Sequence, residues 1–225
     1  MFNIYRKGII LAGGYGTRLY PITTVVSKQL LPVYDKPMIY YALTSLMLAS
    51  IREILIITTP DSSELYKNLL GNGEKFGIKI DYAIQKKPDG LADAFLIAEK
   101  FVANHHSALI LGDNLFHVEH FSRKIDNASK QKKGCSIFLY RVSDPHRYGI
   151  VELDSNNKIT NIVEKPSKPK NNMAVTGLYF YDNTVVDRVK QLSVSARGEL
   201  EITDLNNKFI ILIYLFKKLD LLGII

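Results

Sequence analysis

A glycine-rich turn near the start of the chain has the residue types needed to bind a phosphate group. It follows an apolar run, residues 8–12, of the kind expected of a buried parallel strand. Glycine lets the backbone adopt positive φ and approach a ligand with no Cβ in the way. Successive N–H groups in such a turn form an anion-binding concavity, and an adjacent arginine adds a fixed cation. The candidate ligand-binding residues in this turn are Gly13, Gly14, Gly16, Thr17 and Arg18.

The turn matches neither of two common phosphate-binding motifs. It is not G-x-G-x-x-G in the required register, and it lacks the G-K-[ST] ending of a P-loop. A tight strand-to-helix turn without a ligand is therefore the alternative interpretation. Ligand binding is favoured by the next segment, residues 27–32 (SKQLLP), because Lys28 supplies a second cation ten residues after Arg18. Pro21 and Pro32 indicate that this segment is a fixed loop rather than a helix.

Asp113 is the first candidate metal ligand. It follows a predicted buried strand, residues 108–111, in the sequence LILGDN. At such a position an aspartate is either a ligand of a metal or a ribose, or an ordinary turn residue. Magnesium prefers oxygen ligands, usually one or two carboxylates with phosphates and water, so a single aspartate supplies half of a site.

The elements that must position these residues alternate between strands and helices. Apolar runs predict strands at 8–12, 53–59, 78–83, 108–111 and 135–140, and helical spacing predicts helices at 38–49, 62–70, 91–101 and 121–132. This alternation predicts an α/β fold, a three-layer sandwich with a Rossmann-like and mostly parallel sheet. Ligands bind at the C-terminal ends of the strands in such a sheet, where the glycine turn and Asp113 both fall.

The pattern changes beyond residue 144. Short polar connections join predicted strands at 149–153, 159–163 and 175–181, followed by predicted helices at 183–192 and 200–208. We expect these strands to form an antiparallel lid over the edge of the sheet. Because no linker or repeat interrupts the chain before residue 206, we expect a single domain over 1–206.

Composition limits the kind of partner. The chain has 225 residues and a net charge of +7, which favours acidic ligands such as nucleoside triphosphates and sugar phosphates. Nucleic acid is disfavoured because the lysines are scattered, with a cluster only at Lys130, Lys132 and Lys133. The one cysteine, Cys135, rules out an internal disulfide framework and fits a reducing compartment. With no apparent signal peptide, we expect a cytoplasmic protein that does not bind membranes.

The glycine turn and the lysine loop together resemble a known family. The stretch KGIILAGGYGTRLYPITTVVSKQLLPVYDKPMIYY is similar to the signature of the sugar nucleotidylyltransferases, most closely those that use dTTP and glucose 1-phosphate. The resemblance implies Mg²⁺-dependent transfer of dTMP to glucose 1-phosphate, giving dTDP-glucose and pyrophosphate. It also implies a homotetramer and a role in deoxysugar synthesis, with dTDP-rhamnose and polysaccharides as the usual destination.

The resemblance assigns roles residue by residue. It implies that Arg18, Lys28 and Asp113 are catalytic, that Asp113 binds Mg²⁺ with a second aspartate nearer the C-terminus, and that Gln29 contacts the nucleotide. It implies that Gln85 and Gly90, in YAIQKKPDG, read thymine. It places Tyr148, Gly149, Glu164, Lys165, Val175, Thr176, Gly177 and Arg197 around the sugar phosphate.

The residues alone leave other interpretations of these positions open. Gln85 and Gly90 also fit a polar loop with a turn at Pro88–Gly90, and Lys86 and Lys87 depart from the family pattern there. Glu164 and Lys165 fit a surface ion pair at a strand end. Arg197 could cap a helix or pair with Glu199 or Glu201.

The resemblance ends at about Asn206. Residues 207–225 form an apolar tail without the W-x-D-T-G segment that supplies the second metal aspartate in the family. We expect a shortened or out-of-frame C-terminus, and the apolar run 209–216 is too short to span a bilayer. Two alternatives to a dTTP-using enzyme therefore remain: a catalytically impaired nucleotide-binding remnant, and a uridylyltransferase that uses UTP.

Overall fold

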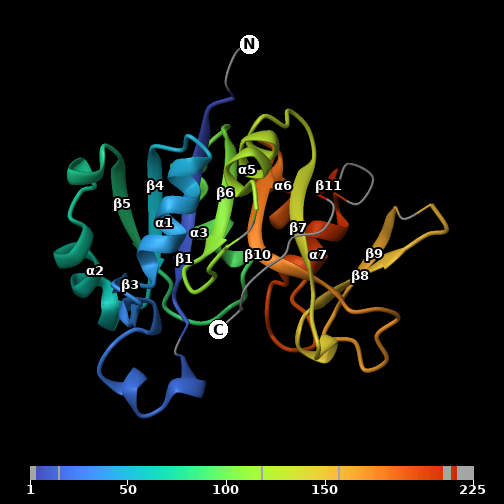
Figure 1. The fold of residues 1–225 in the computed structure, drawn as a ribbon, viewed down its shortest axis with the longest axis horizontal. Helices are drawn as coiled ribbons and strands as arrows, with labels where there is room; N and C mark the ends of the chain where they lie inside the picture. Colours follow the sequence, from blue (N-terminus) through green and yellow to red (C-terminus); the bar gives the residue numbers. More distant parts are fainter. Residues whose placement is uncertain (1–3, 15, 118, 157, 210–213, 217–225) are drawn as a thin grey trace.

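The central sheet of the computed structural model is mixed and mostly parallel (Figure 1). The structure describes residues 4–14, 16–117, 119–156, 158–209 and 214–216. The strands lie in the order β11-β7-β10-β6-β1-β4-β5. Their bounds are β1 Arg6–Ala12, β4 Glu53–Thr58, β5 Lys79–Ile84, β6 His106–Leu111, β7 Cys135–Arg141, β10 Met173–Tyr181 and β11 Tyr214–Phe216.

The first strand lies inside the sheet, and its residues from Gly8 to Ala12 are small or apolar and are all buried. β1 pairs in parallel with β4 on one side and with β6 on the other. Successive side chains of a strand point to opposite faces, so Ile9 packs into the core on one face and Ile10 into the core on the other. A strand buried on both faces reads as a continuous apolar run, which is why this run could be predicted.

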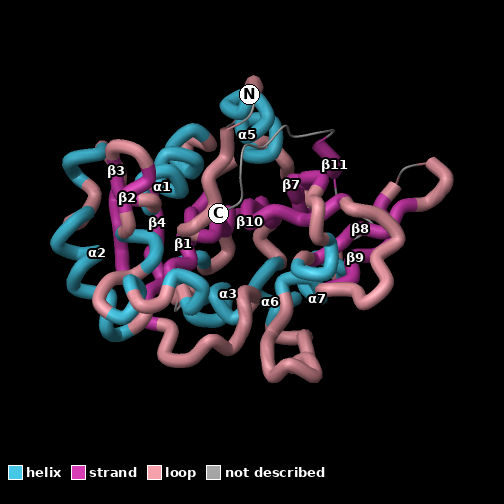
Figure 2. The backbone as a smooth tube through the Cα atoms, turned by 60° about the horizontal axis from the view of Figure 1, so that its bottom comes forward, coloured by secondary structure: helices cyan, strands magenta, loops and turns pink. Residues whose placement is uncertain are grey.

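Helices cover both faces of the sheet, which gives the predicted three-layer α/β sandwich. On one face lie α1 Ile39–Leu48, α2 Ser63–Leu70 and α5 Phe121–Ser129, whose buried residues share a core with Ile10, Ile56 and Ile110. On the other lie α3 Asp93–Ile97, α4 Glu99–Val102, α6 Val185–Val189 and α7 Ile202–Asn207, which share a core with Ile9, Leu55 and Leu109. Figure 2 shows α3, α6 and α7 together on this second face.

The predicted antiparallel lid is present only in part. β8 Gly149–Leu153 and β9 Ile159–Glu164 form a hairpin that projects from the sheet at the right of Figure 1. Among the described residues, β10 pairs with this hairpin through Ala174 and Ile150, and it otherwise enters the main sheet, antiparallel to both β6 and β7. The part of β10 from Leu178 to Tyr181 is at most 3% exposed, so burial on both faces places it inside the sheet rather than over its edge.

Several predicted helices are shorter than expected. The helix predicted at 91–101 is divided into α3 and α4 at Ala98, and the one at 183–192 is reduced to Val185–Val189. Asp182 delays the start of α6, because its carboxylate accepts hydrogen bonds from the backbone N–H and the hydroxyl of Thr184. The smaller elements are the strands β2 Pro32–Val33 and β3 Lys36–Pro37 and the 3₁₀ turns η1 Thr17–Leu19, η2 Ile22–Thr24, η3 Lys28–Leu30, η4 Pro60–Ser62, η5 Glu74–Phe76 and η6 Pro145–Arg147.

Three residues of the predicted apolar tail form a strand. β11 pairs in parallel with β7 through Tyr214, Leu215 and Phe216. The rest of the run after Phe209, residues 210–213 and 217–225, lies outside the described residues. In the described part of the chain, no helix combines the length and apolar character that crossing a membrane requires.

Arg6, at the start of β1, forms hydrogen bonds with three neighbouring segments: β6, β10 and the end of α5. The residue is 4% exposed, and its guanidinium donates to the carbonyl oxygens of Ser129 and Tyr181, both at 2.7 Å, and to those of Ser107 and Gln131. Burial lowers the pKa of Arg6 to about 10, and the nearby Asp182 carboxylate opposes this shift. Arg6 is therefore a structural cation that joins β1, β6, β10 and the end of α5.

We expect Arg6→Met to lower the free energy of unfolding by about 3 kcal/mol, because it leaves buried carbonyls without donors. Urea unfolding followed by circular dichroism measures this. Arg52→Met is the matched control: Arg52 is exposed, donates to the carbonyls of Met47 and Ile51, and should change stability by less than about 0.5 kcal/mol. Equal losses in the two variants would contradict the role of Arg6.

Candidate active site

The glycine turn leaves the C-terminal end of β1 and leads into the loop at the bottom of Figure 1. Gly16 has φ 60° and ψ 33°, and a Cβ there would lie 2.8 Å from Cγ2 of Thr23 and 3.1 Å from Cβ of Lys28. The Thr23 hydroxyl donates to the Gly16 carbonyl at 3.0 Å, which folds the loop back on itself. Thr17 and Arg18 are exposed on η1. A residue without a side chain is therefore required at position 16 to bring the glycine turn and Lys28 together.

Lys28 and Asp113 meet although they lie far apart in the sequence. Nζ of Lys28 is 3.0 Å from Oδ2 of Asp113, and their side chains are only 15% and 30% exposed. Asp113 follows β6, as predicted, and its Oδ1 accepts a hydrogen bond from Nδ2 of Asn114 at 3.1 Å. Lys28, and not Arg18, makes this ion pair, so the two predicted cations occupy different places in the site.

Gln29 fixes the loop that carries Lys28. It is 4% exposed, and its Oε1 accepts hydrogen bonds from the Ser27 hydroxyl at 2.7 Å and the Tyr66 hydroxyl at 3.2 Å. Burial raises the pKa of Tyr66, so its hydroxyl stays protonated and keeps its proton to donate. The structure gives Gln29 this internal role, and its predicted contact with a nucleotide stays a prediction.

A first cavity brings four of the predicted nucleotide-binding residues together: Gly13, Gly14, Gln85 and Gly90. Gln85 follows β5 and is 8% exposed; its Nε2 donates to Oδ2 of Asp93 at 3.0 Å and to the Gly90 carbonyl at 3.4 Å. A Cβ on Gly13 would lie 3.0 Å from Oε1 of Gln85, so the two strand ends approach closely. We call this space, of about 140 Å³, the base cavity; it is lined by Leu11, Gly13, Gly14, Gln85, Pro88, Gly90, Leu91 and Glu199.

A second cavity, of about 290 Å³, contains the predicted sugar-phosphate residues. We call it the sugar cavity. Its lining includes Tyr148, Gly149, Glu164, Lys165, Val175, Thr176, Gly177 and Arg197, each of them predicted from the sequence. Leu91 and Glu199 line both cavities, so the two spaces are neighbours that share a wall.

Charged groups of both signs line the sugar cavity. Arg197 is 3.4 Å from Glu164, 3.2 Å from Glu199 and 3.5 Å from Glu201. The Thr203 hydroxyl donates to Oε2 of Glu164 at 2.6 Å. Burial raises the pKa of Glu201, opposed by a hydrogen bond from Ser195 and by the charge of Arg197. Carboxylates accept hydrogen bonds from sugar hydroxyls and guanidinium groups bind phosphate, so this lining suits a phosphorylated sugar.

Lys165, which lines this cavity, has a strained backbone. Its φ of 43° is in the left-handed region, which is uncommon for residues other than glycine. Its backbone N–H donates to the Tyr148 carbonyl at 3.0 Å, which links β9 to the turn before β8. Strain of this kind costs about 1–3 kcal/mol and is concentrated at functional sites.

The comparisons with known proteins identify the family of this chain. A model described as nucleotidyl transferase matches residues 7–218. The chain belongs to the nucleotidyl transferase family. The prediction of a nucleotidyltransferase enzyme similar to the sugar nucleotidylyltransferases is therefore confirmed.

Among its relatives in the nucleotidyl transferase family is the glucose-1-phosphate thymidylyltransferase of Neisseria meningitidis serogroup A / serotype 4A. It is 57% identical over 204 residues, which is 91% of this chain and 71% of the relative. The enzyme of the same name from Mycobacterium tuberculosis (strain ATCC 25618 / H37Rv) is 50% identical over 204 residues, 91% and 70% of the two chains.

Two solved structures of the nucleotidyl transferase fold are also similar. A Bacillus anthracis protein provisionally named glucose-1-phosphate thymidylyltransferase, in complex with sucrose, is 43% identical with a TM-score of 0.86, covering 94% of this chain and 86% of that one. A UDP-glucose pyrophosphorylase complexed with UDP-glucose is 25% identical with a TM-score of 0.81, covering 95% and 91%. These neighbours confirm the predicted α/β fold with a mostly parallel mixed sheet.

Sequence reasoning missed several residues that line the sugar cavity of this nucleotidyl transferase. Asn114 is 9% exposed, and its Oδ1 accepts a hydrogen bond from the Gly177 N–H at 3.0 Å. The Thr203 hydroxyl donates a hydrogen bond to Glu164, one of the predicted site residues. The others are Leu91, Leu111, Arg147, Tyr179, Glu199, Glu201, Ile202 and Asn206. The sequence offered Glu199 and Glu201 only as ion-pair partners of Arg197, and both do pair with it. The position of Asn114 directly after Asp113 was a signal that could have identified it.

Asp113 can be part of a magnesium site only if a bound nucleotide supplies further oxygen ligands. Among the described residues, no group of three or more His, Cys, Asp and Glu side chains is arranged to hold a metal ion. One partly exposed carboxylate is nevertheless what a magnesium ion would require of the protein if a triphosphate and water supplied its other ligands. The donor set therefore fits a magnesium ion that binds with a nucleotide.

Proposed function

We propose that this nucleotidyl transferase converts dTTP and glucose 1-phosphate into dTDP-glucose and pyrophosphate, with Mg²⁺. The observation that carries the proposal is the pair of adjoining cavities. The base cavity has the glycine turn and an amide edge, and the sugar cavity has carboxylates and cations around Arg197. The nucleotidyl transferase family and the names of the curated relatives support the substrates.

The reaction requires no acid–base pair and no protein nucleophile. A sugar phosphate has a second pKa of about 6, by analogy with other phosphomonoesters, and is therefore a dianion at neutral pH. One of its phosphate oxygens attacks the α-phosphorus and forms a new P–O bond. The bond between the α-phosphorus and the bridging oxygen breaks in line, and pyrophosphate leaves with that electron pair.

The main obstacle is the repulsion between two polyanions. Lys28, Arg18 and the backbone N–H groups of the glycine turn offset the charge of the triphosphate, and Arg197 and Lys165 hold the sugar phosphate. Magnesium bound by the triphosphate and Asp113 would add positive charge at the leaving group. Glu164, fixed by Thr203, and the backbone of Gly149 and Val175 orient the sugar hydroxyls.

Product analysis tests the substrate assignment. We expect dTDP-glucose to be detected by mass spectrometry after incubation with dTTP, glucose 1-phosphate and Mg²⁺. UTP is the second candidate nucleotide, because uracil and thymine offer the same hydrogen-bonding edge to Gln85 and one solved neighbour binds UDP-glucose. A higher rate with UTP than with dTTP at saturating concentrations would overturn the dTTP assignment and leave nucleotidyl transfer in place.

We expect Gln85→Ala to raise the KM for dTTP about tenfold and to change kcat by less than about threefold. The amide borders the base cavity and would pair with the edge of the base, remote from the reacting phosphorus. Steady-state kinetics with each substrate varied measures both constants. Gln191→Ala, at an exposed position, is the control. An unchanged KM for dTTP would remove Gln85 from base recognition.

A further inference from the structure

The loop that borders the base cavity is bonded directly to the turn that carries Arg197. The Leu200 N–H donates to the Asp89 carbonyl at 2.7 Å, and the Ala92 N–H donates to the Leu200 carbonyl at 3.1 Å. These two backbone hydrogen bonds hold Leu200 across Gly90. We call this contact the 90–200 bridge.

Gly90 is the residue that makes the bridge possible. Its φ is 111°, and a Cβ there would lie 2.3 Å from the Leu200 carbonyl oxygen and 2.6 Å from the Leu200 nitrogen. Cβ atoms are not found at such distances from backbone atoms, so any side chain at position 90 must separate the two segments. The predicted role of Gly90, reading the base, does not by itself explain this close approach.

The segment that precedes Leu200, residues 195–199, is a tight turn that carries Arg197, one of the residues lining the sugar cavity. The Ser195 N–H donates to the Glu199 carbonyl and the Gly198 N–H to the Ser195 carbonyl, both at 2.9 Å. The Ser195 hydroxyl accepts the Arg197 N–H at 3.2 Å and donates to Oε1 of Glu201 at 2.9 Å. Because the turn is internally bonded, displacing Leu200 displaces Arg197 with it.

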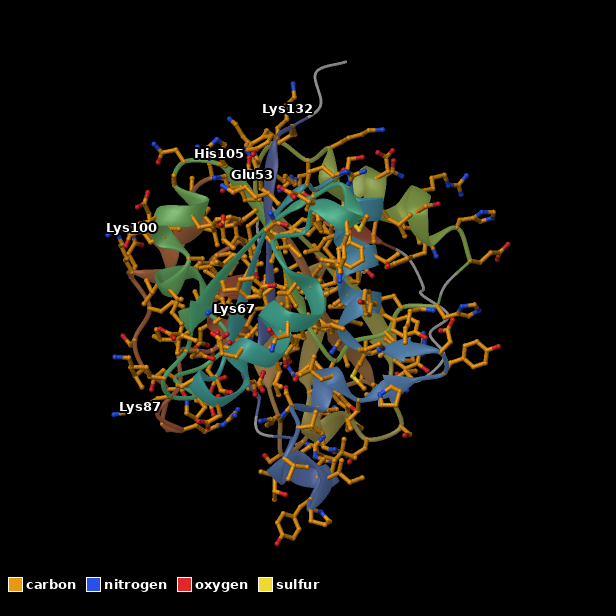
Figure 3. All side chains as sticks on the ribbon, turned by 90° about the vertical axis from the view of Figure 1, so that its left-hand side faces the viewer. Glu53, Lys67, Lys87, Lys100, His105 and Lys132 are labelled. Carbon is orange, nitrogen blue, oxygen red and sulfur yellow. The ribbon has the colours of Figure 1, made fainter. Side chains whose placement is uncertain are left out.

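The 90–200 bridge also adjoins Gln85, a residue of the base cavity. Nε2 of Gln85 donates to the Gly90 carbonyl at 3.4 Å, and Glu199, next to Leu200, lines both cavities. Lys87, on the same loop, is exposed and lies at the edge of the molecule in Figure 3, so the loop contacts the rest of the site through Gln85 and Gly90 rather than through its lysines.

We propose that Gly90 is a positioning residue for the sugar phosphate: through Leu200 it sets the place of Arg197 in the sugar cavity, and it thereby couples occupation of the base cavity to binding of the sugar phosphate. This proposal rests on the proposed function for the identity of the two ligands. The coupling is reciprocal, as any coupling between two binding equilibria must be.

Kinetics of Gly90→Ala test the proposal. At saturating dTTP, we expect the KM for glucose 1-phosphate to rise about tenfold or more, since a misplacement of about 1 Å in a positioning group has effects of this size. Gly71→Ala is the control: Gly71 also has positive φ, but a Cβ there meets nothing within 4 Å, and both KM values should stay within about twofold of wild type. An increase confined to the KM for dTTP would overturn the proposal.

Hydrogen–deuterium exchange tests the bridge without any turnover. In the free protein, we expect Gly90→Ala to speed exchange of the 195–201 backbone amides about fivefold or more relative to wild type and to Gly71→Ala. If Gly90→Ala does not fold, wild-type protein is compared with and without dTTP, which should slow exchange in the same segment. Exchange rates of residues 195–201 that do not differ, between Gly90→Ala and wild type or between wild type with and without dTTP, would overturn the role of the 90–200 bridge. A wild-type protein with no turnover contradicts the proposed function instead.

Discussion

Replacing Lys28 with alanine should lower kcat by about a hundredfold or more while leaving the fold intact, as expected when a charged group that stabilises a transition state is removed. Lys28 is held in place by its ion pair with Asp113, and the loop that carries it is held by the hydrogen bonds of Gln29 with Ser27 and Tyr66. In the proposed reaction, its ammonium group is thereby preorganised to offset the charge that develops on the leaving pyrophosphate. Initial rates at saturating substrates measure the loss.

Lys36→Ala is the matched control for Lys28→Ala. Lys36 also pairs with an aspartate, Asp35, but its side chain is 42% exposed on the β2–β3 hairpin. Exposed pairs of this kind contribute little to stability and nothing to a distant reaction. Circular dichroism and thermal melting should give near-wild-type curves for both variants. Equal activity of the two lysine variants would contradict the role of Lys28.

Replacing Asp113 with asparagine should also lower kcat about a hundredfold or more and should weaken the dependence of the rate on Mg²⁺. Asparagine keeps the size of the side chain but removes the charge that faces Lys28 and that would contact the metal. The measurement is a Mg²⁺ titration of the rate, with Asp126→Asn as control because Asp126 pairs with Lys130 on an exposed helix surface. A Mg²⁺ titration curve like that of wild type would contradict the metal assignment.

The effects of Lys28→Ala and Asp113→Asn on activity should not be additive. Lys28 and Asp113 are in contact, and residues in contact show interaction energies that separate double variants from the sum of single ones. We expect the double variant, Lys28→Ala with Asp113→Asn, to lose less activity than the product of the two single losses. A product of the single effects would indicate that the ion pair has no part in the reaction.

Local patterns predicted the parts of the fold that depend on short-range sequence. The apolar run of β1, the glycine turn after it and Asp113 after β6 could be located because buried parallel strands read as continuous apolar runs with ligands at their C-terminal ends. The position of β10 between β6 and β7 could not be predicted. The apolar run near its end fits either a lid or a buried strand, and only long-range pairing decides between them.

In the candidate site, too, features set by local sequence could be predicted and features set by long-range contacts could not. Residues near a motif, such as Gln85 and Arg197, were identified, and the resemblance to the sugar nucleotidylyltransferases supplied their expected roles. The Lys28–Asp113 pair and the bond from Thr203 to Glu164 join residues 85 and 39 positions apart, and no local pattern contains such information. The contact of Gly90 with Leu200 belongs to this second group.

The most direct test of nucleotidyl transfer between the two cavities is pyrophosphate release by the purified protein, measured with Mg²⁺ and dTTP in the presence and absence of glucose 1-phosphate. The proposed function predicts release only when both substrates are present, in an amount equal to the dTDP-glucose formed. Release from dTTP alone, or no release with both substrates while dTTP still binds, would contradict it; the latter result would identify a catalytically impaired nucleotide-binding protein.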